Sequence, residues 1–157
     1  MLRLEIVRAC EDDLPEILAL QRLAFYDNSI RYGDPNMPPM PQTLDELRAE
    51  SKGKVFLKAI ENGKIVGTIR GHMDGEICRV SKVMVLPDHQ NRGIAHKLLD
   101  AIEDEFRVRV FELKTGYLDD KNIHLYKKVG YVLTGEKFWE TETLCFVRMR
   151  KEKNSPP

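Results

Sequence analysis

The stretch 76–115 constrains the fold of this chain more than any other part of the sequence. The segment EICRVSKVMVL (76–86) is rich in apolar and β-branched residues, and from Gly93 apolar residues recur at helical spacing as far as Phe106. A further apolar run, VRVFELKT, follows at 108–115. A strand, a long helix and a second strand in this order predict a right-handed crossover between two parallel strands.

The strand at 76–86 also ends a predicted antiparallel meander. One Asn-Gly and one Asp-Gly dipeptide separate three apolar runs, which lie at 55–60, 65–73 and 76–86. Both dipeptides favour the tight turns of β-hairpins, because their residues adopt positive φ angles readily. We therefore expect three antiparallel strands that continue into the parallel crossover.

The N-terminal third combines a strand, two helices and a long connection. A short strand is expected at 2–7, and the acidic tripeptide at 11–13 is typical of the first turn of a helix. Thr43 and Glu46 fit a capping box that opens a second helix. The segment 26–42 between the helices carries four prolines, so a loop is expected there, and a loop of this length is often functional.

The last third adds a short helix at 119–129 and a final antiparallel pair of strands at 131–138 and 143–151. The predicted fold class is therefore mixed α/β. It has a central, mostly antiparallel sheet with one parallel strand–helix–strand crossover, and helices flank the sheet.

The composition predicts an ordinary globular domain in a reducing compartment. Lys and Arg number 25, as do Asp and Glu, so zero formal net charge gives no bias towards nucleic acid or an anionic membrane. Three scattered cysteines predict neither a disulfide framework nor a zinc site. The chain lacks a membrane-span pattern and signal-peptide character, so we expect a cytoplasmic protein. One domain should span 1–152, followed by a disordered tail at 153–157.

The turn PDHQNRGIAHKLL (87–99) has the features of an anion site. A helix N-terminus leaves backbone N–H groups unpaired and carries partial positive charge. Gly93 lets the backbone approach a ligand, Ala95 is small, and Arg92 supplies a guanidinium suited to phosphate. The alternative is a plain strand-to-helix turn with a surface arginine. The Rossmann and P-loop glycine patterns are both absent, so a phosphate would bind by another scheme.

Two segments resemble the GNAT N-acetyltransferases. Residues 83–95, VMVLPDHQNRGIA, resemble the family's acetyl-CoA motif, in which a strand ending in V-x-P precedes [RQ]-x-x-G-x-[GA] and a helix. The segment NIHLYKKVGY (122–131) resembles the family's N…LYxKxGF segment, with Tyr131 in place of phenylalanine. The predicted order of strands and helices also resembles that fold over nearly the whole chain.

The resemblance implies acetyl-CoA as cosubstrate and no metal. It implies that the strands at 76–86 and 108–115 splay apart, so that the pantetheine arm pairs like an added strand with the backbone of Val83, Met84 and Val85. The diphosphate is then expected on backbone N–H groups of the turn, namely those of Gln90, Asn91, Arg92, Gly93, Ile94, Ala95 and His96. The resemblance also implies that Asn122 bonds the pantetheine or diphosphate region.

The implied reaction is direct attack of a neutral amine on the thioester. Tyr126 matches the family's usual general acid, which would protonate the leaving thiolate; packing in the core is the other interpretation of this residue. Backbone N–H groups near Val85 are candidates for stabilising the oxyanion. Many relatives carry a glutamate six residues before the motif valine, where this chain has Arg79. The general base therefore stays unassigned.

Three other residues near that position were weighed as bases. Glu76, His72 and Glu112 lie on the same or neighbouring predicted strands. Each is explained more simply as an exposed strand residue, so none is chosen.

In this family the acceptor site is built from the first helices, their connection and the last hairpin. The connection contributes Tyr32 and Met37 and is poor in acidic residues, so it gives no signal for a polycationic acceptor. The predicted acceptor is a primary amine of a small molecule or peptide, and the family's frequent dimers leave a homodimer open. The alternative is a non-catalytic, acyl-CoA-binding regulatory module on the same fold. Tyr126 and Asn122 favour the enzyme, and the missing glutamate favours the module.

Overall fold

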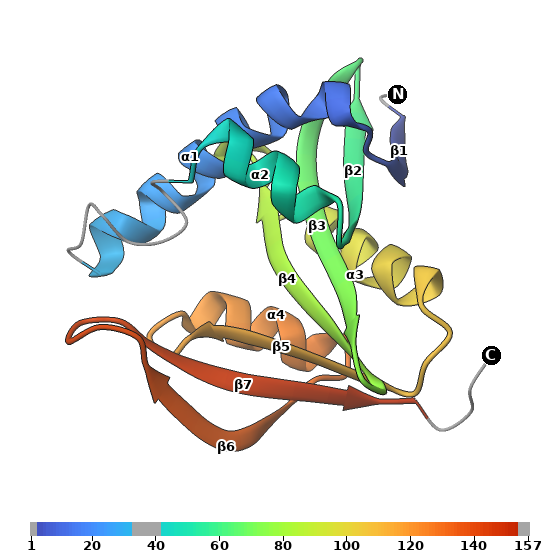
Figure 1. Cartoon of the computed structure of the whole chain (residues 1–157). Helices are drawn as coiled ribbons and strands as arrows, with labels where there is room; N and C mark the ends of the chain where they lie inside the picture. The colour runs from blue at the N-terminus through green and yellow to red at the C-terminus, as the bar shows by residue number, and fades with distance from the viewer. Residues whose placement is uncertain (1–2, 33–41, 154–157) are drawn as a thin grey trace.

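The computed structural model describes residues 3–32 and 42–153, and for residues 27–32 it describes the backbone only. Its strands form one mixed sheet in the order β1-β2-β3-β4-β5-β7-β6 (Figure 1). The strands are β1 (Leu4–Arg8), β2 (Val55–Glu61), β3 (Lys64–Asp74), β4 (Ile77–Val85), β5 (Val110–Gly116), β6 (Val132–Trp139) and β7 (Cys145–Glu152). Neighbouring strands are antiparallel except β4 and β5, which are parallel. The predicted mixed α/β class and its parallel crossover are confirmed.

The helices lie close to their predicted positions. They are α1 (Leu14–Tyr32), α2 (Leu44–Ser51), α3 (Ile94–Glu105) and α4 (Asp120–Lys128), with short 3₁₀ turns at Glu11–Asp13 and Pro87–His89. The capping box of α2 is present, because the Glu46 N–H donates to Thr43 Oγ1 at 3.1 Å and the Thr43 N–H donates to Glu46 Oε1 at 3.0 Å.

The end of α1 corrects one prediction. The loop expected from residue 26 begins later, because α1 continues to Tyr32. No proline occurs between Pro15 and Pro35, so the asparagine and serine near residue 28 do not interrupt the helical hydrogen bonds. Tyr32 is thus the last residue of a helix rather than a loop residue. Its side chain, and the whole of Met37, lie outside the described residues.

Alternation along β3 places different helices on the two faces of the sheet. Gly67 and Gly71 face α3, and an added Cβ would meet Leu98 or Ile102 at about 3 Å, so the glycines allow α3 to pack closely. The intervening Arg70 is fully buried on the other face, where it contacts side chains of α1 and α2. Most of the apolar core lies between the sheet and these helices.

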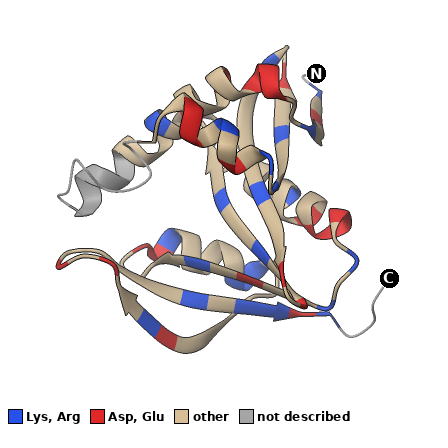
Figure 2. Cartoon of the chain, in the orientation of Figure 1, with Lys and Arg blue, Asp and Glu red and all other residues tan. Residues whose placement is uncertain are grey.

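The C-terminal strands add a detail that the sequence patterns did not provide. β7 lies between β5 and β6 and is antiparallel to both. Residues 154–157 of the predicted tail lie outside the described residues, whereas the Lys153 N–H donates to the Arg109 carbonyl at 2.7 Å. In the described part of the chain, no helix is both long enough and apolar enough to cross a bilayer. Basic and acidic residues are interspersed along the helices and strands (Figure 2).

Candidate active site

The parallel strands β4 and β5 separate shortly after they begin. Among the described residues they pair only at Ile77–Val110, Cys78–Phe111 and Arg79–Glu112. Beyond these pairs the strands diverge (Figure 1), and a cavity of about 660 Å³ opens between them. Its lining includes the rest of β4, the end of β5, the turn before α3, and α4. The separation implied by the family resemblance is therefore present.

The β4 wall of the cavity is an unpaired strand edge. Val83, Met84 and Val85 all line the cavity. No residue from Val80 to Val85 pairs with β5 in the described structure, so the backbone groups on that side have no ladder partner there. The carbonyl of Val85 accepts a hydrogen bond of 3.3 Å from the Gln90 side chain. An extended ligand can pair with the remainder of this edge as an added strand does.

The turn before α3 forms one end of the cavity. Asn91 and Gly93 have φ angles of 65° and 81°, and Gly93 is the N-cap of α3. The N-terminus of α3 leaves backbone N–H groups without helical partners and carries partial positive charge, so this end of the cavity suits an anion. The cavity is lined here by predicted residues Gln90, Asn91, Gly93, Ile94, Ala95 and His96.

Of the residues 90–96, which were predicted to hold the diphosphate, Arg92 is the one that does not line the cavity. Its guanidinium lies 3.6 Å from the Glu61 carboxylate at the end of β2, and its side chain is 53% exposed. The arginine side chain therefore contacts the meander rather than the cavity. Only its backbone belongs to the turn that closes the site.

Helix α4 brings the predicted Asn122 and Tyr126 to the opposite wall. Asp119 caps the helix by accepting from the Asn122 N–H at 3.1 Å, and it also accepts from the Asn122 side-chain amide at 2.9 Å. This pair of bonds orients Asn122. The described structure gives its amide oxygen no partner, which leaves an acceptor for a ligand.

Tyr126 belongs both to the core and to the cavity wall. Its side chain is 5% exposed and packs edge-to-face against Tyr131, with ring centroids 6.2 Å apart. Burial raises the pKa of the Tyr126 phenol, and the negative charge of Asp119 adds to the shift. A raised pKa keeps the phenol protonated, which suits a proton donor rather than a base.

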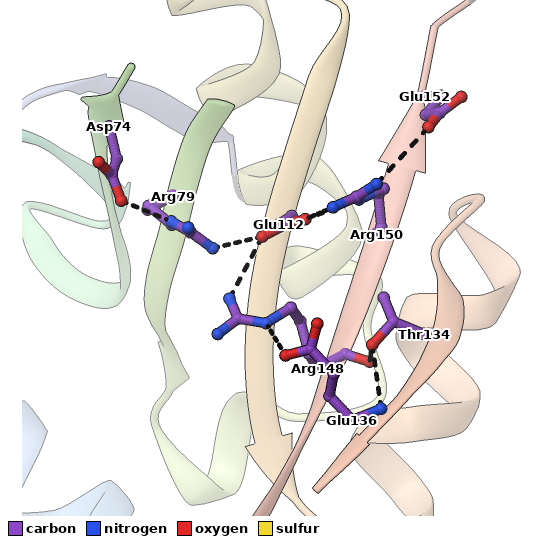
Figure 3. A network of polar contacts seen from close by, with 8 residues as sticks. All are labelled: Asp74, Arg79, Glu112, Thr134, Glu136, Arg148, Arg150 and Glu152. Atoms are coloured by element: carbon purple, nitrogen blue, oxygen red, sulfur yellow. Dashed lines mark hydrogen bonds and ion pairs between the residues drawn. The ribbon is translucent and has the colours of Figure 1, made fainter. Parts of the chain in front are cut away.

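The residues weighed as general bases lie away from the cavity. Glu76, His72 and Glu112 are all absent from its lining, and so is Arg79, which stands where many relatives have a glutamate. Glu112 is 2% exposed and accepts hydrogen bonds from Arg79, Arg148 and Arg150 (Figure 3). The exposed strand position expected for Glu112 is therefore wrong, because arginines of β4 and β7 cover its carboxylate.

The pKa of Glu112 excludes it further as a base at neutral pH. Burial alone would raise this pKa, but the hydrogen bond and charge of Arg150, with the charges of Arg79 and Arg148, offset burial and lower it. A carboxylate with a lowered pKa and three cationic partners is a poor acceptor for a proton. The Glu112 carboxylate instead links β5 to the neighbouring strands β4 and β7 through these arginines.

Lys82 is a cavity residue that the sequence reasoning missed. The register between β3 and β4 shifts here, since Thr68 pairs with Met84 and Arg70 with Ser81. Two residues of β4 thus oppose one of β3, and Lys82 takes a φ of 55° at this bulge. The sequence gives one signal for this residue, namely a lysine inside the largely apolar run at 76–86. The bulge itself depends on the register between β3 and β4, which the periodicity of the sequence does not reveal.

The end of the cavity beside α1 is lined by residues that the sequence reasoning did not name. Ala24 and Phe25 of α1 line it, together with Lys114, Glu140 and Phe146 from the C-terminal strands and their connection. The family's use of the first helix and last hairpin is matched in outline. The two residues named from the connection, Tyr32 and Met37, are not described at side-chain level.

Comparisons with known proteins agree with this geometry. A curated relative, the L-amino acid N-acyltransferase MnaT of Escherichia coli K12, is 30% identical over 84 residues, which span 48% of this chain and 49% of that protein. The chain thus matches about half the length of that relative.

Solved structures match over nearly the whole chain. The PaiA N-acetyltransferase of Thermoplasma acidophilum in complex with coenzyme A superposes with a TM-score of 0.78 and 15% identity, covering 96% of this chain and 99% of that one. YncA from Salmonella typhimurium with its cofactor acetyl-CoA superposes with a TM-score of 0.75 and 20% identity, covering 99% of this chain and 98% of that one. At these identities the likeness establishes the fold.

The family is established by a separate match. The model of the acetyltransferase (GNAT) family matches residues 14–131, a segment that includes β4, the turn before α3, and α4. This segment holds both motifs on which the resemblance was based and most of the cavity wall. The chain belongs to the acetyltransferase (GNAT) family.

Proposed function

We propose that this chain is an N-acetyltransferase that moves an acetyl group from acetyl-CoA to a primary amine of a small molecule or peptide. One observation carries the proposal. The cavity between the separated strands β4 and β5 is lined by an unpaired strand edge, a helix N-terminus and a buried phenol. These three features suit the pantetheine arm, the diphosphate and the protonation of the leaving thiolate, respectively.

Each wall of the cavity would take one part of acetyl-CoA. The pantetheine arm would pair with the edge at Val83, Met84 and Val85, and the diphosphate would lie on the N–H groups of the turn from Gln90 to His96. Asn122 would bond the arm through its amide oxygen. Lys121 and Lys128 also line the cavity and add positive charge, and the Lys121 ammonium donates to the Gln90 side chain of that turn at 3.2 Å.

The chemistry is direct attack of the neutral amine on the thioester carbonyl. The C–N bond forms, the oxyanion accepts hydrogen bonds from β4 N–H groups near Val85, and collapse of the intermediate breaks the C–S bond. Tyr126, whose raised pKa leaves the phenol protonated at neutral pH, donates its proton to the leaving thiolate. The proton that the amine nitrogen loses as the amide forms passes to water, and the phenolate recovers a proton from water.

A panel of amines tests the transfer. CoA release is followed with a thiol reagent while acetyl-CoA is offered with amino acids, amino acid amides, peptides with free N-termini, polyamines and aminoglycosides. Amino acids belong in the panel because a curated relative is named an L-amino acid N-acyltransferase. Turnover of at least one amine supports the proposal. Tight binding of acetyl-CoA without turnover of any amine would instead favour a non-catalytic acyl-CoA-binding module.

We propose a single domain over residues 1–152, a cytoplasmic location and a homodimer. Light scattering of the purified chain measures the assembly directly, with a mass of twice 18.2 kDa expected for the dimer.

A further inference from the structure

Lys82 is a cation in the cavity wall that lacks a counter-ion. In the part of the chain that the structure describes, it forms no hydrogen bond or ion pair. The bulge in β4 places it at the centre of the sheet, where the cavity is bounded by α1 on one side and by β5 and β7 on the other. An ammonium group at such a position is costly unless an anion reaches it.

The other cations near Lys82 are all paired. Arg70 and Lys54 share the carboxylate of Glu50, with N–O distances of 3.3 and 3.0 Å. Lys114 lies 2.6 Å from Glu140 across the cavity wall. Counted with Lys82, these described groups are four cations and two carboxylates, so the surroundings of Lys82 carry an excess of positive charge.

The pKa of Lys82 reflects the same lack of negative charge. Burial, together with the positive charge of Arg70, lowers the pKa of the Lys82 ammonium to about 8, although the negative charge of Glu50 offsets part of the shift. An anion bound beside Lys82 would raise this pKa and stabilise the charged form.

The backbone at Lys82 adds an independent observation. Its φ of 55° lies in the left-handed region, which is strained for a residue other than glycine. Glycine would occupy this position without that cost, yet the chain has lysine. Strained residues that line a cavity are typical of functional sites.

We propose that Lys82 binds a carboxylate of the acceptor, so that the acceptor is an amine that also carries an acidic group, as an amino acid does. The inference rests on the proposed function, because it assigns the acceptor of the same transfer. A single ammonium matches the single charge of a carboxylate. The excess positive charge disfavours polyamines and aminoglycosides, and it helps the acceptor's own ammonium lose the proton that blocks attack.

The experiment compares matched acceptors on matched variants. An amino acid and its amide present the same side chain and amine position, but only the acid carries the carboxylate. The ratio of their kcat/KM values is measured for the parent chain, for Lys82→Met and for Lys114→Met. Comparing this ratio between variants removes the intrinsic difference in amine basicity. Lys114→Met is the control, because Lys114 lines the same cavity but is already paired with Glu140.

Loss of one charge-assisted hydrogen bond predicts the size of the effect. Lys82→Met should lower kcat/KM for the acid by about 10- to 100-fold and change it for the amide by less than about 3-fold. Lys114→Met should leave the ratio near that of the parent. Equal losses on acid and amide, or no loss on the acid, would overturn the proposal, as would a parent that uses polyamines better than amino acids.

Two further measurements separate the possible failures. Binding of an N-acetylated amino acid and of its amide, measured by calorimetry, tests the carboxylate contact without turnover; the parent should prefer the acid and Lys82→Met should not. If no amine is acetylated, the proposed function fails, whereas acetylation with equal use of acids and amides defeats only the role of Lys82. Lys82→Met removes no hydrogen bond or ion pair of the described structure and should unfold at the same or higher temperature, so misfolding will not explain a loss.

Discussion

Strands β4 and β5 have a closed half, where Ile77–Arg79 pair with Val110–Glu112, and an open half beyond these pairs. The two halves differ in whether their buried charges have partners. In the closed half the strands are paired, and the buried Glu112 is surrounded by Arg79, Arg148 and Arg150, which also contact acidic residues at the rim (Figure 3). In the open half the strands are apart, and Lys82 has no partner in the described structure. The paired charges around Glu112 hold neighbouring strands of the sheet together, whereas the unpaired Lys82 is left for a ligand. Substitutions in the open half should therefore affect catalysis and binding, and those in the closed half stability.

The largest effect is expected from Tyr126→Phe in the open half. Removing the proton donor to the thiolate should lower kcat by about 10²- to 10³-fold. The phenylalanine keeps the ring that packs on Tyr131, so the melting temperature and the affinity for acetyl-CoA should not change. Steady-state kinetics, calorimetry and thermal unfolding check the three values. Full turnover at every pH would return Tyr126 to a packing role.

Gly93→Asp should weaken acetyl-CoA binding by about 10²-fold. The new residue must adopt a φ of 81°, and its carboxylate would repel the diphosphate at the helix N-terminus. Gly63→Asp is a matched control, because Gly63 has a φ of 72° and open space around it but lies in the β2–β3 hairpin. Calorimetric titration should show normal affinity for the control. Equal affinities for both variants would make the stretch around Gly93 an ordinary turn.

Glu112→Gln in the closed half should reduce the free energy of unfolding by about 2 kcal/mol and leave kcat within about 2-fold. The folded pKa of Glu112 is lowered, so its stabilisation is present above the ordinary carboxyl pKa and is lost as the pH falls through the folded value. Urea unfolding at several pH values should show a weaker acid dependence in the variant. The exposed Glu152→Gln, which removes only a 4.0 Å contact with Arg150, should behave like the parent.

The smallest effect is expected from Arg92→Ala. The Arg92 side chain contacts Glu61 and not the cavity, so acetyl-CoA affinity should change by less than about 3-fold. Calorimetry under the conditions used for Gly93→Asp makes the comparison direct. A loss of ten-fold or more would show that the guanidinium reaches the cosubstrate when it binds.

Local elements of the fold could be predicted because their signals are local. Asn62 and Gly63 take the positive φ angles expected of their turn, and Thr43 and Glu46 form the expected capping box. The end of α1 was missed because residues that are rare in helices were given more weight than the absence of proline. These features depend on a few neighbouring residues, so periodicity and turn chemistry were nearly sufficient.

The site required information that local patterns lack. The backbone positions of the turn and α4 came from two motifs, whereas the contact of Arg92 with Glu61 depends on how the meander packs. The burial of Glu112 needs arginines from β4 and β7, and β7 reaches that place only because it inserts between β5 and β6. The bulge at Lys82 depends on the register between strands. Each of these features joins residues distant in sequence.

The unpaired edge of β4 also bears on solubility. A row of free N–H and C=O groups on a strand is a template on which other chains can pair and aggregate, and proteins commonly protect such rows with charges or short strands. Here the row lies in the interior of the sheet, between β5, α4 and the turn before α3, rather than at its rim. To pair with this row, a strand of another chain would have to enter between these elements. The fold thus keeps a strand edge open for a ligand without exposing it to aggregation.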